Sequence, residues 1–130
     1  MVGEVKRAVR VAERVREELA WLLARDVRDP RCAGVTVSRV EMPDDLRLAR
    51  VFVRLLEGGD SEERRREAMT GLQRAAGMLR TAVGRGVGLR FAPELRFAYD
   101  DGQEKQARVE KLLAEVEHEK RTPAKRGVKA

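Results

Sequence analysis

The sequence contains few residues of the kinds that build disulfides, metal sites or catalytic centres. Among its 130 residues there is one cysteine, one histidine and five aromatic residues. The single cysteine, Cys32, excludes an internal disulfide and a cysteine-rich metal site. As a nucleophile it would need a base, and the chain offers none that is convincing. The histidine, His118, is expected at the surface near the end of a last helix. We therefore expect no enzyme, no cofactor and no metal.

Long apolar runs are missing as well. Residues 1–6 lack the apolar core of a signal peptide, and no later run is long enough to span a membrane. A chain of 130 residues suits one domain with a real hydrophobic core. We expect a cytoplasmic monomer without a membrane partner.

Arginine, in contrast, is abundant. The formal net charge is +6, and 22 of the 28 basic residues are arginine. The planar guanidinium group fits phosphate oxygens and stacks on bases, so this composition favours a polyanionic partner such as a nucleic acid. Arginine can also be solvated surface or reflect the coding bias of a genome, and composition alone leaves these alternatives open.

Hydrophobic periodicity predicts a single α+β domain of two layers, with the order helix, strand, strand, helix, helix, strand. The first helix should run from about residue 5 to residue 26 and stop at Asp29-Pro30-Arg31. A strand follows from Val35, and its change of phase indicates a β-bulge near Ser38 and Arg39. The remaining predicted features are a turn at 43–45, a strand at 49–55, an N-cap at Asp60, a strand at 93–99 and a last helix at 106–116.

The stretch from Arg74 to Arg80 allows two interpretations. Gly77 interrupts a helical apolar pattern, and Ala75 and Ala76 in front of it leave the backbone unshielded. One interpretation is a single helix with a tolerated glycine. The other is a hinge, at which one helix ends near Gly77 and a second begins at an angle, with another backbone packed closely against the glycine. We adopt the hinge as our prediction.

Several other motifs have plain structural interpretations. The aspartate pairs at 44–45 and 100–101 suggest turns rather than carboxylate catalysis. The glycines at 84, 86 and 88 follow no strand, so they do not form a dinucleotide fingerprint, and we expect a flexible helix exit there. Phe52 lies between Arg50 and Arg54 on one face of a strand, which is compatible with base stacking but is more often simple packing. The run of arginines at 64–66 is typical of a solvated face.

A series of short motifs occurs in order over roughly residues 4–116. They are Arg10-Val11-Ala12-Glu13-Arg14-Val15, Asp29-Pro30-Arg31, Val35-Thr36-Val37, Asp44-Asp45-Leu46, Ala49-Arg50-Val51-Phe52-Val53, Ala75-Ala76-Gly77-Met78-Leu79-Arg80, Leu89-Arg90, Pro93-Glu94-Leu95-Arg96-Phe97 and Asp100. Each motif alone is weak. Together, at this spacing, they make the chain resemble the bacterial ribosome-binding factor A family.

The resemblance implies a type II KH-like fold for residues 4–117. For residues 118–130 the basic residues themselves, which lack an apolar pattern, predict a disordered tail. It also implies a non-enzymatic factor that binds the free small (30S) ribosomal subunit and assists its late maturation. The family supports efficient processing of 16S rRNA, notably in the cold, with contacts proposed near the 5′-terminal helix of that RNA. KH domains clamp a nucleic-acid backbone with a Gly-x-x-Gly loop between two helices. This chain has Ala75-Ala76-Gly77 there instead, so broader electrostatic contact is expected.

The candidate RNA-binding residues follow from helical spacing. Lys6, Arg7, Arg10 and Arg14 should form one basic strip on the first helix, and Arg74 and Arg80 bracket the expected interhelical kink at residues 75–77. The alternative function is a generic single-stranded RNA-binding KH-like module, against which the missing loop and the few aromatic rings argue. A protein-only adaptor would bind its partner with little sensitivity to salt.

Overall fold

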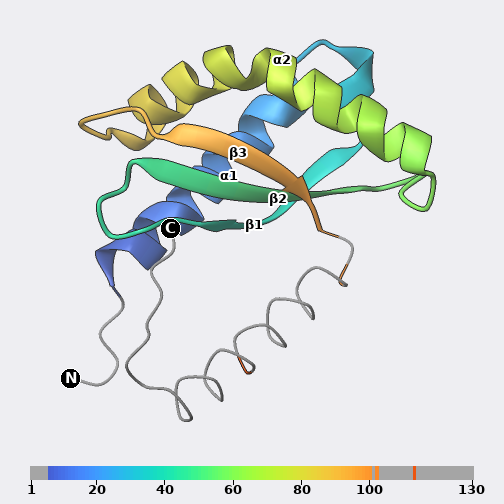
Figure 1. Cartoon of the computed structure of the whole chain (residues 1–130). Helices are drawn as coiled ribbons and strands as arrows, with labels where there is room; N and C mark the ends of the chain where they lie inside the picture. Colours follow the sequence, from blue (N-terminus) through green and yellow to red (C-terminus); the bar gives the residue numbers. More distant parts are fainter. Residues whose placement is uncertain (1–5, 101, 103–112, 114–130) are drawn as a thin grey trace. The chain divides into compact units, whose positions relative to one another are not determined.

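Two long helices and a three-stranded sheet make up the described part of this computed structural model (Figure 1), which covers residues 6–100, 102 and 113. The elements are α1 (Arg7–Arg25), the short 3-10 helix η1 (Pro30–Cys32), β1 (Val35–Glu41), β2 (Leu48–Leu55), α2 (Glu62–Val87) and β3 (Glu94–Tyr99). Contacts divide the chain into two units after Tyr99. All of these elements belong to the first unit, and their mixture confirms the α+β prediction.

Helix α1 forms because most of its apolar residues recur every three or four positions and reach one side, although Val9 and Trp21 stay exposed. Val15 and Leu19 are fully buried on that side. The helix ends with Asp26 as its C-cap, and Asp29 then caps η1, since its Oδ1 atom accepts a hydrogen bond from the Arg31 N–H at 2.9 Å. The predicted limits of the helix are confirmed to within about a residue at its C-terminus, and Val5 lies outside the described residues.

Strand β2 is the centre of the sheet, paired antiparallel with β1 and parallel with β3. The β1–β2 register shifts between Val37 and Arg39, so the predicted β-bulge is confirmed. The turn before β2 is also confirmed, because the Leu46 N–H donates to the Pro43 carbonyl at 3.0 Å. The parallel pairing of β3 requires a crossover, which α2 provides.

The hydrophobic core lies between the two helices and one face of the sheet. The face of β2 that carries Ala49, Val51, Val53 and Leu55 is buried, as its alternation predicted. Helix α1 packs on β1, helix α2 packs on β3, and the two helices contact each other. Each fully buried valine or leucine contributes roughly 1.5–3 kcal/mol to folding. The helices therefore form one layer, held in a fixed position on the sheet.

The predicted hinge at Gly77 is wrong, because α2 is one continuous helix across it. The ribbon arches over the sheet in Figure 1 without a break. Gly77 is exposed, and a Cβ atom built there would meet no atom within 4 Å, so nothing packs closely against it. A mid-helix glycine costs only about 1 kcal/mol. That cost is too small to end a helix whose Leu72 and Leu79 are fully buried on either side of it.

Both ends of α2 differ from the prediction. The N-cap is Ser61 and not Asp60: the Ser61 Oγ atom accepts from the Arg64 N–H at 3.1 Å. A turn over residues 58–61, closed by the Ser61 N–H on the Gly58 carbonyl, moves the start of the helix one residue on. At the other end the helix continues through the expected exit to Val87. It stops at Gly88, whose φ of 78° is a left-handed conformation.

Several sequence predictions lie outside the described residues, namely the last helix at 106–116, the basic tail at 118–130, His118 and Asp101. Asp100 is described, and its Oδ1 atom accepts from the Gly102 N–H at 3.4 Å. In the part of the chain that the structure covers, no helix is long and apolar enough to cross a membrane. The same residues contain no cluster of three or more histidine, cysteine or acidic side chains suited to a metal.

Candidate nucleic-acid interface

The structure brings four of the six candidate RNA-binding residues onto one face of α1. Lys6 is the N-cap of this helix, and Lys6, Arg7, Arg10 and Arg14 are all exposed. The helix buries its opposite side, which includes Ala8, Val11, Ala12 and Val15. The spacing of three and four residues places the cations along one line on the surface. We call Lys6, Arg7, Arg10 and Arg14 the basic strip.

The basic strip lies at the helix end where a macrodipole is positive. The first turn of α1 contains no acidic residue, and no side chain caps it. Cations at a helix N-terminus disfavour the helix slightly, whereas anions are stabilised there. The arrangement therefore lowers helix stability by a small amount and raises the positive potential. A phosphate group would relieve both effects.

Acidic residues of α1 lie beside the basic strip rather than within it, with one exception. Glu13 accepts hydrogen bonds from the Arg16 guanidinium, with Nε–O distances of 3.0 and 3.1 Å, and this pairing lowers the pKa of Glu13. The charge of Glu13 is thereby compensated by a residue outside the strip. The exception is Glu17, which is exposed three residues after Arg14. It marks the end of the purely cationic part of this face.

Two turns beyond Arg14 the same face carries the only tryptophan of the chain. Trp21 keeps 46% of its surface exposed, and the Arg25 guanidinium carbon lies 3.9 Å from the centroid of its ring. Sequence reasoning missed this pair because it counted aromatic residues without placing them. The signal was available: Trp21 follows Arg14 by seven residues and precedes Arg25 by four, both of which are same-face helical spacings.

Arg74 and Arg80, the two candidates on α2, are not brought into one patch. They are six residues apart in an unbroken helix, so they point in directions roughly 120° apart. Both are exposed. Arg80 donates from Nε and Nη2 to the Ala92 carbonyl at 3.3 and 3.2 Å, so it also supports the chain before β3. Because α2 is unbroken between them, no gap between two helices lies there for an RNA to grip.

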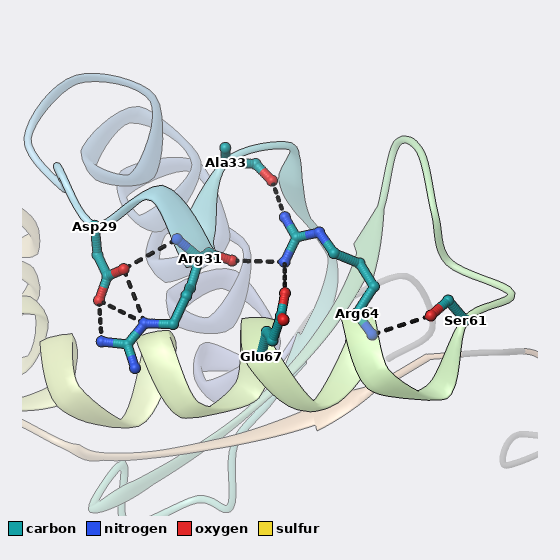
Figure 2. A network of polar contacts seen from close by, with 6 residues as sticks. All are labelled: Asp29, Arg31, Ala33, Ser61, Arg64 and Glu67. Carbon is teal, nitrogen blue, oxygen red and sulfur yellow. Dashed lines mark hydrogen bonds and ion pairs between the residues drawn. The ribbon is translucent and has the colours of Figure 1, made fainter.

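The loop after α1 is built around a two-pronged ion pair, shown in Figure 2. Arg31 donates from Nε to Asp29 Oδ1 at 3.0 Å and from Nη2 to Asp29 Oδ2 at 2.6 Å. These bonds, together with the backbone bond from Arg31, lower the pKa of Asp29 to about 2. Arg74 adds a smaller favourable charge interaction. The Asp-Pro-Arg motif is thus a structural clamp.

Arg64 fastens this loop to the first turns of α2 (Figure 2). Its Nη1 atom donates to the Arg31 carbonyl at 3.1 Å, and its Nη2 atom donates to the Ala33 carbonyl at 2.8 Å. Glu67 lies 3.9 Å from the same guanidinium. The prediction that the arginine run at 64–66 is a solvated face is therefore wrong for Arg64.

Arg65 also has a structural role. It donates to the Gly59 carbonyl and stacks over the ring of Tyr99, with 4.5 Å from its guanidinium carbon to the ring centroid. The Tyr99 hydroxyl in turn accepts from the Leu55 N–H at 3.0 Å. Within the run at 64–66, Arg66 is the exposed member. Arg64 and Arg65, in contrast, are partly buried and bonded to neighbouring segments of the fold.

Cys32 and Phe52 are both buried. The sequence had left open a nucleophilic role for Cys32 and a base-stacking role for Phe52. Cys32 is buried against α2, and burial raises the pKa of its thiol, with a smaller contribution from Asp29. A protonated buried thiol is a poor nucleophile. Phe52 keeps only 3% of its surface exposed, and Arg39 stacks on it with the guanidinium carbon 3.9 Å from the ring centroid. Its ring therefore offers no open stacking surface, in agreement with the packing interpretation.

Comparison with known proteins gives one consistent result. A family model described as "Ribosome-binding factor A" matches residues 7–113. Ribosome-binding factor A of Sorangium cellulosum is 54% identical over 116 residues, which span 89% of this chain and 93% of the relative. That of Syntrophobacter fumaroxidans is 43% identical over 113 residues, spanning 87% of this chain and 96% of the relative.

Solved structures agree. The crystal structure of ribosome-binding factor A from Thermus thermophilus matches with a TM-score of 0.61 at 27% identity, over 71% of this chain and 93% of that chain. A homology model of the Thermus thermophilus factor, fitted into a cryo-EM map of a 30S–RbfA complex, matches with a TM-score of 0.57 at 26% identity, over 70% and 92% of the two chains. These likenesses confirm the predicted KH-like α+β fold. With the match of residues 7–113 and relatives of this identity, the chain belongs to the ribosome-binding factor A family.

Proposed function

We propose that this chain binds the free small (30S) ribosomal subunit through its 16S rRNA and assists the late maturation of that subunit as a non-enzymatic factor. The observation that carries the proposal is family membership across residues 7–113, with 54% identity to a ribosome-binding factor A. The Thermus thermophilus relative, described in a 30S–RbfA complex, adds support for the partner.

The basic strip supplies the physical means of binding. Guanidinium and ammonium groups on phosphates release condensed counterions, so affinity falls steeply as salt concentration rises. Such contacts fix position and orientation and read no base sequence, so the shape of the folded RNA has to select the site. We assign this role to Lys6, Arg7, Arg10 and Arg14, and we keep Arg74 and Arg80 as further candidate contacts.

The finer parts of the proposal come from the sequence resemblance. The factor would support efficient processing of 16S rRNA near its 5′-terminal helix, and its absence would matter most in the cold. It would act in the cytoplasm as a monomer, with no cofactor and no membrane partner. The alternative is a generic single-stranded RNA-binding module. Every observation that fits this alternative also fits the ribosome-binding interpretation.

The experiment is sedimentation of the tagged full-length protein through a ribosome gradient. We expect the protein to comigrate with free small subunits, and to be absent from whole ribosomes and from free large subunits. The same protein centrifuged without ribosomes is the control and should stay at the top of the gradient. Equal binding to whole ribosomes, or failure to leave the top fractions when free small subunits are present, would contradict the proposal.

A further inference from the structure

Trp21 is an exposed aromatic residue that the fold does not need for its core. Its neighbours Leu22 and Leu23 point into the core, whereas Trp21 keeps 46% of its surface open. The residues that the structure describes contain few exposed rings, and Phe91, between α2 and β3, is the other large one. A tryptophan left half in water on a helix surface is a common feature of interfaces.

The surroundings of Trp21 select the kind of partner. The ring lies about 10 Å along the helix axis from Arg14, on the same face as the basic strip. The Arg25 guanidinium carbon lies over one face of the ring, 3.9 Å from the centroid, so a cation already covers that face. The face thus carries the basic strip, followed by Trp21 with Arg25 over its ring. Single-stranded nucleic-acid sites have a similar layout, in which cations bind the phosphates and aromatic rings stack on the bases.

Glu17 refines this assignment. It is exposed four residues before Trp21 and lies between the ring and Arg14. A carboxylate at this point disfavours a phosphate directly beside the ring, but it does not disfavour the flat, uncharged face of a base. The strip would therefore hold the backbone at Arg10 and Arg14, while the ring receives a base.

We propose that Trp21 is a stacking platform for one unpaired RNA base, which would lie on the ring face opposite Arg25 while the Arg25 guanidinium supports the ring from the other side. The proposal rests on the proposed function, because the RNA in question is that of the small subunit. Paired bases are excluded as ligands, since both of their faces are already stacked inside a helix. An aromatic or apolar pocket of a ribosomal protein is the competing occupant, and the test below separates the two.

The test uses the fact that the chain has one tryptophan, so its fluorescence reports on this ring alone. The full-length protein is titrated with an adenine-rich single-stranded RNA and with an RNA duplex that carries the same number of phosphates. Stacking of a base on the indole should quench the fluorescence with the single strand and leave it nearly unchanged with the duplex. Equal quenching by both, or none by the single strand, would overturn the proposal.

Variants extend the test to the small subunit itself. Trp21→Leu should weaken binding to free small subunits about tenfold, which is the effect expected for the loss of one stacked base. Trp21→Phe, which retains a ring, should recover most of the affinity. No charge is lost, so the dependence on salt should keep its slope. Phe91→Leu is the matched control, because it removes an exposed ring beside an arginine, Arg90, elsewhere in the chain and should leave affinity unchanged.

The outcomes separate this proposal from the proposed function. If the wild-type protein binds free small subunits and Trp21→Leu binds equally well, the stacking platform is wrong and ribosome binding stands. If Trp21→Leu loses affinity but single-stranded RNA does not quench the wild-type tryptophan, the ring fits a protein pocket and the proposal is also wrong. If the wild-type protein does not bind free small subunits at all, the proposed function fails first. Thermal melts followed by circular dichroism verify that each variant is folded.

Discussion

Gly71 and Gly77 lie in the same helix, yet the substitution of alanine for glycine should change stability in opposite directions at the two positions. A Cβ atom at Gly71 would lie 2.9 Å from Arg31 Cβ and 3.0 Å from Cys32 Sγ. At Gly77 the added atom would meet nothing within 4 Å. The close backbone approach that the sequence suggested for Gly77 therefore occurs six residues earlier, where α2 packs on η1.

The magnitudes follow from two opposing effects. Alanine gains about 1 kcal/mol over glycine in a helix interior, whichever the position. At Gly71 the extra methyl group overpacks the contact with η1, which costs about 1–3 kcal/mol. The η1 residues have little freedom to yield, because Asp29 and Arg64 hold the backbone and side chain of Arg31. We expect Gly71→Ala to destabilise the protein by about 1 kcal/mol and Gly77→Ala to stabilise it by about 0.5–1 kcal/mol.

Thermal and urea denaturation of both variants provide the measurement. For a domain of this size, about 1 kcal/mol corresponds to a shift of roughly 4–8 °C in Tm. The melting temperature should therefore rise for Gly77→Ala and fall for Gly71→Ala relative to the wild type. A loss of stability in Gly77→Ala would show that a hinge exists there after all. An equal gain in both variants would show that α2 does not approach η1 closely.

Two further predictions concern the clamp between η1 and α2. Arg64→Ala should lower the free energy of unfolding by about 1–2 kcal/mol, because the carbonyls of Arg31 and Ala33 lose a charged donor, whereas Arg66→Ala should change it by less than about 0.5 kcal/mol in the same urea titration. Asp29→Asn should reduce the acid sensitivity of the fold. Because the folded pKa of Asp29 is about 2 against an ordinary value of 3.8, its stabilising contribution is complete above pH ~4 and is lost as the pH falls toward ~2. Urea midpoints of wild type and Asp29→Asn should therefore converge in acid, and a constant gap between them would contradict the assignment.

The parts of the fold that depend on local patterns could be predicted from the sequence. The apolar spacing in α1 and the change of phase at Ser38 each reflect a period that the residues themselves set, and the structure confirms both. The outcome at Gly77 could not be predicted in this way. Whether a glycine ends a helix depends on what the helix packs against on either side, and that information is tertiary.

The same distinction applies to the candidate site. The basic strip could be derived from spacing alone, because it lies within one helix. The role of Arg64 could not be derived in this way. Its acceptor is the backbone carbonyl of Arg31, 33 residues away in the sequence, and no side-chain pattern reveals a bond to a distant carbonyl. The sequence prediction grouped Arg74 and Arg80 around a break in the helix. Because α2 is unbroken, the two side chains point in different directions. Trp21 could have been found by extending the spacing of the strip by two turns.

The central claim is that the basic strip of α1 binds the phosphates of the small subunit. It is tested most directly by the salt dependence of affinity for free small subunits, measured for Arg7/Arg10/Arg14→Gln and for Arg47/Arg66/Arg85→Gln. The control set also consists of three exposed arginines, so the two proteins carry the same net charge. We predict that the first set weakens binding and flattens the log–log salt slope by about three, one for each lost phosphate contact, and that the control set keeps the wild-type slope. A flattened slope in the control set, with an unchanged slope in the α1 set, would place the interface elsewhere on the protein and contradict the claim.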